Sequence, residues 1–178
     1  MSVPSDTTGV MFRGITSTLA ILLFVGYAAA QNRTTVGSVS RESPFAPLAG
    51  SWSGAGTIDL NNGKHEPIRC RASYDVLDDQ NKLQLNLHCA SESYNFDLRA
   101  SAAYSGGAIT GTWSESSRNA AGSLSGKVEG VGFQVLAKGQ TFSANLNLVT
   151  HGDKQSVTIN SQDPQAEVRG ATITLRRG

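Results

Sequence analysis

The sequence has 178 residues, with 15 basic and 14 acidic side chains and a formal net charge of +1. A nearly neutral chain lacks the extended positive field that nucleic acid or anionic lipid attracts, so we exclude nucleic-acid binding as its function. Charged residues make up 16% of the chain, against about a quarter in an average soluble domain, while glycine, serine and threonine are plentiful. This composition is typical of secreted β-sheet proteins.

The first residues have the pattern of a cleavable signal peptide. Arg13 precedes an apolar run that ends at Ala28–Ala30. The apolar centre of about a dozen residues is too short to cross a bilayer, and small side chains at the end of the run suit signal peptidase. We predict a signal peptide over residues 1–30, a periplasmic or secreted protein, and no stable membrane insertion after cleavage. A retained anchor is the alternative, and translation starts at either Met1 or Met11.

The next segment, residues 31–47, is polar, lacks periodicity and ends in Pro44 and Pro47. These features predict a disordered linker. The rest of the chain, residues 48–178, has the length of one domain.

From residue 48 onward, short segments alternate apolar with polar residues and are separated by turn residues. This is the pattern of antiparallel strands, and no stretch has a helical period. We predict an all-β fold, an antiparallel meander of about eight to ten strands that forms a barrel or a closed sandwich. The expected strands cover residues 49–60, 66–77, 82–90, 94–104, 108–116, 121–129, 131–138, 141–150, 154–161 and 167–176.

The two cysteines belong to one expected hairpin. A turn centred between Asp79 and Gln80 places Cys70 directly opposite Cys89 and Tyr74 opposite Leu85. In this register the alternate residues of both strands form one apolar face. Opposed residues of an antiparallel pair are close enough for a disulfide, so we predict a Cys70–Cys89 bond in an oxidising compartment.

Small residues recur on the expected inner face of the sheet: Ala72, Ala100, Gly111, Gly126, Ala137 and Ala144. They either allow tight packing or line a cavity, and both interpretations stay open. In the cavity interpretation, we predict four ligand-binding aromatic residues: Tyr74, Phe96, Trp113 and Phe133.

Gly50, Ser51 and Trp52 open the first expected strand, and a Gly-x-Trp there followed by a strand meander resembles the calycin superfamily of lipocalins, fatty-acid-binding proteins and avidins. The resemblance implies that Trp52 closes the barrel base under an arginine of the last strand, Arg176 or Arg169. The chain departs from the family because ten strands exceed the eight of lipocalins and it leaves no room for a C-terminal helix. It is also similar to small secreted α-proteobacterial proteins of unknown function.

The sequence has few candidate catalytic or metal-binding residues. His65 and His151 fall in expected turns, His88 points outward, and no serine lies in a Gly-x-Ser-x-Gly elbow. We therefore predict no catalytic residue, no metal ligand and no cofactor, and we do not expect an enzyme.

Two function classes follow from this interpretation. The first is an exported β-barrel protein of unknown activity whose partner is a small apolar ligand bound in the interior. The second is a non-enzymatic structural or protein-interaction domain of the cell envelope with a filled core. A continuous cavity of roughly 300 Å³ or more favours the first, and a filled core favours the second.

Overall fold

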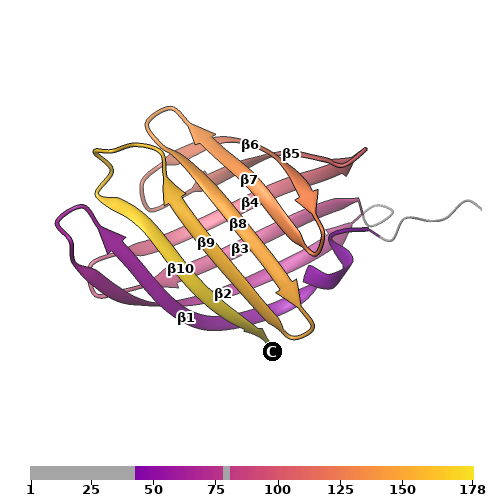
Figure 1. The fold of residues 1–178 in the computed structure, drawn as a ribbon, viewed down its shortest axis with the longest axis horizontal. Coiled ribbons are helices and arrows are strands. Elements are labelled where there is room, and N and C mark those ends of the chain that lie inside the picture. Colours follow the sequence, from indigo (N-terminus) through magenta and orange to yellow (C-terminus); the bar gives the residue numbers. More distant parts are fainter. Residues whose placement is uncertain (1–42, 78–80) are drawn as a thin grey trace, which may run out of the picture. The chain divides into compact units, whose positions relative to one another are not determined.

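The computed structural model describes residues 43–77 and 81–178. These residues form a closed antiparallel barrel in which successive strands pair and β1 pairs with β10 (Figure 1). No helix in this part of the chain has the length and apolarity needed to span a bilayer. The short 3-10 helix η1 (Ala46–Leu48) precedes the strands, which are β1 (Gly50–Leu60), β2 (His65–Leu77), β3 (Lys82–Ala90), β4 (Asn95–Ser105), β5 (Ala108–Glu115), β6 (Ala120–Glu129), β7 (Gly132–Gly139), β8 (Ser143–His151), β9 (Lys154–Ser161) and β10 (Val168–Arg177).

The predicted all-β fold is confirmed, and it is a barrel and not a sandwich. Each strand begins and ends within two residues of its expected bounds. The predicted signal peptide over residues 1–30, and the part of the predicted linker before Ser43, lie outside the described residues.

The register predicted for the β2–β3 hairpin is also confirmed. Cys70 pairs with Cys89 and Tyr74 with Leu85, and these apolar pairs alternate with polar pairs such as Arg71 with His88. The two cysteines form a disulfide with their Cα atoms 4.1 Å apart. Both are buried, so the bond joins β2 to β3 on the inner face of the barrel.

Some of the small inward residues allow neighbouring backbones to approach closely. A Cβ atom on Gly54 would lie 2.0 Å from the carbonyl oxygen of Thr174, and one on Gly111 would lie 2.1 Å from that of Ser101. No side chain fits at these positions, so glycine is required there. Other small inward residues, including Ala137 and Ala144, line a cavity, so both interpretations left open by the sequence apply in different parts of the barrel.

One end of the barrel is closed by the segment before β1. Phe45 is 1% exposed, stacks on Phe133 with ring centroids 5.8 Å apart, and contacts the edge of Tyr104 at 6.4 Å. Leu48 in η1 is also buried. The prediction of a disordered linker is therefore wrong for residues 43–47, because the aromatic ring between the two prolines packs into the core.

Trp52 lies at this closed end beneath an arginine, as the resemblance to calycins implied, but the arginine is neither Arg176 nor Arg169. The guanidinium of Arg177 lies 4.4 Å from the Trp52 ring and donates to the carbonyl oxygens of Pro47 and Ala49. The indole of Trp52 donates to the carbonyl of Leu48 at 2.7 Å. Together these contacts fasten η1 to the first and last strands.

Strand parity explains the correction. Trp52 is paired with Arg177 across β1 and β10, whereas Arg176 is paired with Ser53 on the outer face. Successive side chains of a strand point to opposite faces, so Arg177 shares the inner face with Trp52 and Arg176 does not. Arg176 instead lies 3.5 Å from Asp153. Arg169 lies at the other end of β10, where the register shifts, and it donates to the carbonyl of Pro164.

Candidate ligand-binding site

The interior of the barrel contains a cavity of about 380 Å³ toward the end opposite η1. Side chains from both halves of the barrel line it, and most are apolar. They include Ile58, Ile68, Leu87, Cys89, Phe96, Leu98, Trp113, Phe142, Leu146, Ile159 and Ile173. Leu87, Leu98, Leu146 and Ile159 face inward yet keep accessible surface, so the core is incompletely filled at this level.

The four aromatic residues predicted to bind a ligand are divided between the two ends of the barrel. Phe96 and Trp113 line the cavity. Tyr74 and Phe133 lie outside it, at the closed end. Phe133 stacks on Phe45, while the Tyr74 hydroxyl donates to Gln155 at 2.8 Å, so the closing segment and a buried polar pair occupy the space near them.

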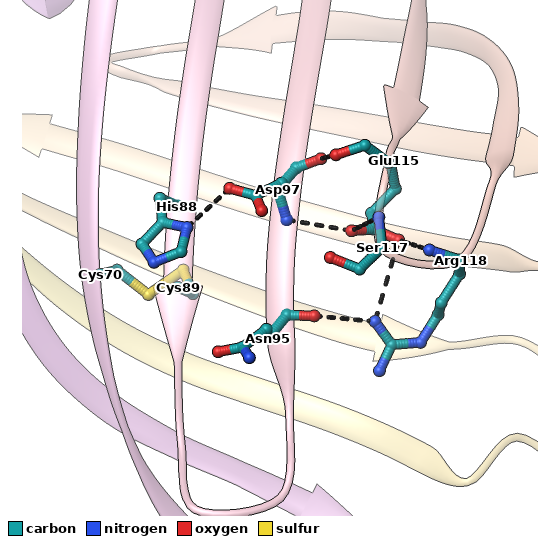
Figure 2. A network of polar contacts seen from close by, with 9 residues as sticks. Cys70, His88, Cys89, Asn95, Asp97, Glu115, Ser117 and Arg118 are labelled. Atoms are coloured by element: carbon teal, nitrogen blue, oxygen red, sulfur yellow. Dashed lines mark hydrogen bonds and ion pairs between the residues drawn. A yellow bond between two sulfur atoms is a disulfide. The ribbon is translucent and has the colours of Figure 1, made fainter.

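The mouth of the cavity is formed by the turns at the ends of β3, β5, β7 and β9. Tyr94 and Phe96 stack with centroids 6.1 Å apart, and the Arg118 guanidinium lies 4.6 Å from the Phe96 ring. Arg118 also donates to the carbonyl of Asn95 at 3.0 Å (Figure 2). The Glu167 carboxylate and then burial raise the pKa of the Tyr94 hydroxyl. The rim is thus aromatic and polar, whereas the interior is apolar.

Glu115 holds the β5–β6 turn that carries Arg118. Its carboxylate accepts from the backbone N–H groups of Asp97 at 2.9 Å, Ser117 at 3.0 Å and Arg118 at 2.8 Å (Figure 2). Burial raises the pKa of Glu115, but these donors outweigh it, and the net pKa lies below the ordinary value. The carboxyl group is therefore committed to shaping the turn and is unsuited to acid catalysis.

This network predicts a pH-dependent contribution to stability. A depressed pKa stabilises the fold above the ordinary glutamate pKa, and the contribution is lost as the pH falls through the lower folded value. Glu115→Gln should lower the free energy of unfolding at neutral pH by about 1–3 kcal/mol and reduce its loss on acidification. Urea denaturation across the acid range measures both effects. The control Glu92→Gln, at an exposed position, should change neither quantity. If Glu115→Gln loses as much stability on acidification as wild type does, the proposed role of Glu115 is contradicted.

The histidines do not contribute to the cavity. His88 is exposed on the outside of β3, with Nδ1 2.6 Å from Asp97, and His65 makes a similar contact with Asp59 at 2.6 Å. His151 is exposed at the end of β8. Within residues 43–77 and 81–178, no cluster of three or more histidine, cysteine or acidic residues is arranged to hold a metal ion.

A second depression lies on the outer face of β1 to β5. Its lining is mostly serine, asparagine and charged side chains, including Arg71, Arg99 and the His88–Asp97 pair. It is open to solvent, and its polar groups can be hydrated without a ligand. The interior cavity, which is apolar and more enclosed, is the better candidate for a binding site.

Sequence reasoning missed Arg118. It falls in a turn, where side-chain directions do not follow strand alternation, and nothing in the local pattern indicates that its side chain lies over Phe96. Phe142 fell within the expected strand 141–150 but was not among the predicted ligand-binding residues. It precedes β8, and its ring meets the edge of Trp113 with centroids 5.9 Å apart.

Comparison with known proteins shows that this chain resembles solved structures in fold alone. No protein-family model matches the sequence. No curated protein matches it either. Among solved structures, Rv2717c from M. tuberculosis superposes with a TM-score of 0.60 at 12% identity, over 75% of this chain and 94% of that one. The S-type phycobiliprotein lyase CPES from Guillardia theta gives 0.58 at 10% identity, over 78% and 94%. The chain thus shares the barrel fold of these two solved structures.

Proposed function

We propose that this protein is a non-catalytic binding protein that holds a small, largely apolar ligand inside the barrel. The observation that carries the proposal is the apolar cavity of about 380 Å³ beneath an aromatic and polar mouth. Its volume falls within the range of about 300–1,000 Å³ typical of small-molecule sites. One solved structure with a similar fold is a phycobiliprotein lyase. A barrel that binds a small molecule in its interior is compatible with this similarity.

Packing energetics support a role for the cavity. Protein interiors are normally close-packed, and side chains that border a void lose dispersion contacts. Leu98 and Leu146, on opposite sides of the barrel, both line the void and keep accessible surface. A ligand would restore these contacts, and its burial would add the hydrophobic contribution of its own surface.

The proposal includes export. The Cys70–Cys89 disulfide forms and persists in oxidising compartments such as the periplasm or the extracellular space, and not in a reducing cytosol. Together with the apolar run before Ala30, this bond supports an exported protein that meets its ligand outside the cytoplasm.

A fluorescence titration with N-phenyl-1-naphthylamine, a neutral dye that brightens in apolar surroundings, tests binding. The wild-type protein should bind the dye with saturation at one site. The double variant Leu98→Phe/Leu146→Phe, which narrows the cavity from two sides, should weaken binding at least about tenfold, equivalent to about 1.4 kcal/mol. Its free energy of unfolding should stay within about 1–3 kcal/mol of wild type.

The matched control is Leu136→Phe, because Leu136 is on the outer face of β7, where it lines a surface depression with Asn145. This variant should bind the dye like wild type. Equal binding by wild type and Leu98→Phe/Leu146→Phe would overturn the proposal and favour an envelope interaction domain whose function lies on its surface.

A further inference from the structure

Trp113 carries a buried hydrogen-bond donor without a protein partner. It is 6% exposed, and its indole Nε1 is the buried side-chain polar atom that lacks an acceptor among the described residues. Buried donors are nearly always paired, because an unpaired one forfeits the hydrogen bond it had with water. The other tryptophan, Trp52, is paired with Leu48. The unpaired donor therefore calls for an explanation specific to the position of Trp113.

The barrel fixes the indole in place through small neighbours. Trp113 lies in a cross-strand row with Ala100, Gly122 and Gly139. A Cβ atom at residue 139 would lie 3.0 Å from Cζ2 of the indole, so glycine there provides the space that the ring occupies. Phe142 packs its ring against the indole at 77°. Packing on these sides holds the ring in one orientation, which preorganises the N–H group for an acceptor.

Trp113 also lines the interior cavity. The side-chain acceptors of that lining belong to residues at the ends of strands and in the loops of the mouth, and none of them accepts from Nε1: Glu115, Thr141, Ser161, Asp163 and Glu167. The Glu115 carboxylate, one inward position nearer the mouth, already accepts three backbone N–H groups. The aliphatic and aromatic side chains around the indole have no lone pairs. A partner for Nε1 must therefore come from the contents of the cavity.

We infer that the ligand carries an oxygen acceptor, such as a ketone, aldehyde or ester carbonyl, that receives the hydrogen bond of Trp113 Nε1. This inference rests on the proposed binding function and specifies its ligand class as neutral, largely apolar molecules that carry a carbonyl oxygen. A neutral acceptor suits the interior, because an ionised group there would lose its hydration without a buried countercharge. Trp113 acts as a specificity residue, since an apolar molecule lacking oxygen leaves the donor unpaired.

The test uses two compounds of matched shape, benzophenone and 1,1-diphenylethylene, which differ by a carbonyl oxygen in place of a methylene group. Each is titrated against bound N-phenyl-1-naphthylamine in wild type and in Trp113→Phe. The variant should weaken benzophenone binding about 3–10-fold more than diphenylethylene binding, as expected for one neutral hydrogen bond. The control Phe142→Leu, which removes aromatic volume but no donor, should weaken both compounds by the same factor.

Indole ¹⁵N–¹H spectra give a second readout that a purely structural Trp113 would not change. The sequence has two tryptophans, so Trp113→Phe assigns both signals. Benzophenone should move the Trp113 N–H signal downfield, diphenylethylene should not, and Trp52 should stay unchanged. Equal losses for both compounds in Trp113→Phe, with no downfield shift, would overturn this inference while leaving the binding function intact. No binding of the dye or of either compound by wild type would overturn both.

Discussion

Removal of the Cys70–Cys89 disulfide is expected to lower the free energy of unfolding by about 3 kcal/mol. The bond closes a loop with a sequence separation of 19 and joins β2 to β3 beside the cavity. Its loss frees the unfolded chain, and this domain has no second disulfide among its described residues to compensate. Urea denaturation of wild type and of Cys70→Ala/Cys89→Ala measures the difference.

Alanine is the suitable replacement because both positions are buried and apolar. Dithiothreitol supplies the internal control: it should lower the stability of wild type to that of the double variant and leave the double variant unchanged. A double variant as stable as the oxidised wild type would show that the bond adds nothing to the barrel.

Phe45→Ala is expected to destabilise the protein by about 3–5 kcal/mol, the cost of removing a fully buried phenylalanine. The ring of Phe45 fills the closed end of the barrel against Phe133 and Tyr104. Truncation would leave a cavity between these rings and would weaken the attachment of η1. Thermal or urea denaturation measures the loss.

Val131→Ala is the matched control, because Val131 lies between β6 and β7 and is 57% exposed. Its effect should stay within about 0.5 kcal/mol. A similarly small effect of Phe45→Ala would mean that the segment before β1 does not stabilise the barrel, and the domain boundary would then return to residue 48.

The strand ladder was predictable because it depends on a period of two. In β2 and β3 the apolar residues alternate with polar ones, and a shift of one residue would have turned the cysteines to opposite faces. The pairing of Cys70 with Cys89 therefore followed from the sequence. The choice of barrel over sandwich did not, because it depends on the pairing of β1 with β10, which no local pattern specifies.

The closed end was not predictable for a different reason. Phe45 is a lone aromatic residue between two prolines in a polar stretch, so it has no periodicity from which burial could be inferred. Its burial is a tertiary effect, since the open barrel end accepts the ring. Phe133 was expected to bind a ligand because strand alternation points its side chain inward. The side chain does point inward, but the ring of Phe45 stacks on it and occupies the adjacent space.

The candidate site was predictable only in part. Phe96 and Trp113 were expected to line a cavity, and their inward positions on β4 and β5 place them there. The unpaired indole N–H of Trp113 could not be anticipated, because satisfaction of a donor depends on which side chains surround it in three dimensions. The same is true of Arg118, whose position over Phe96 depends on the turn that Glu115 holds.

The central claim is that a small molecule occupies the barrel, and native mass spectrometry of the protein isolated from its own host tests it most directly. Wild type should retain an added mass of a small organic compound that is released on unfolding, and Leu98→Phe/Leu146→Phe prepared in the same way should lack it. A bare polypeptide mass for wild type, together with no saturable dye binding, would contradict the claim.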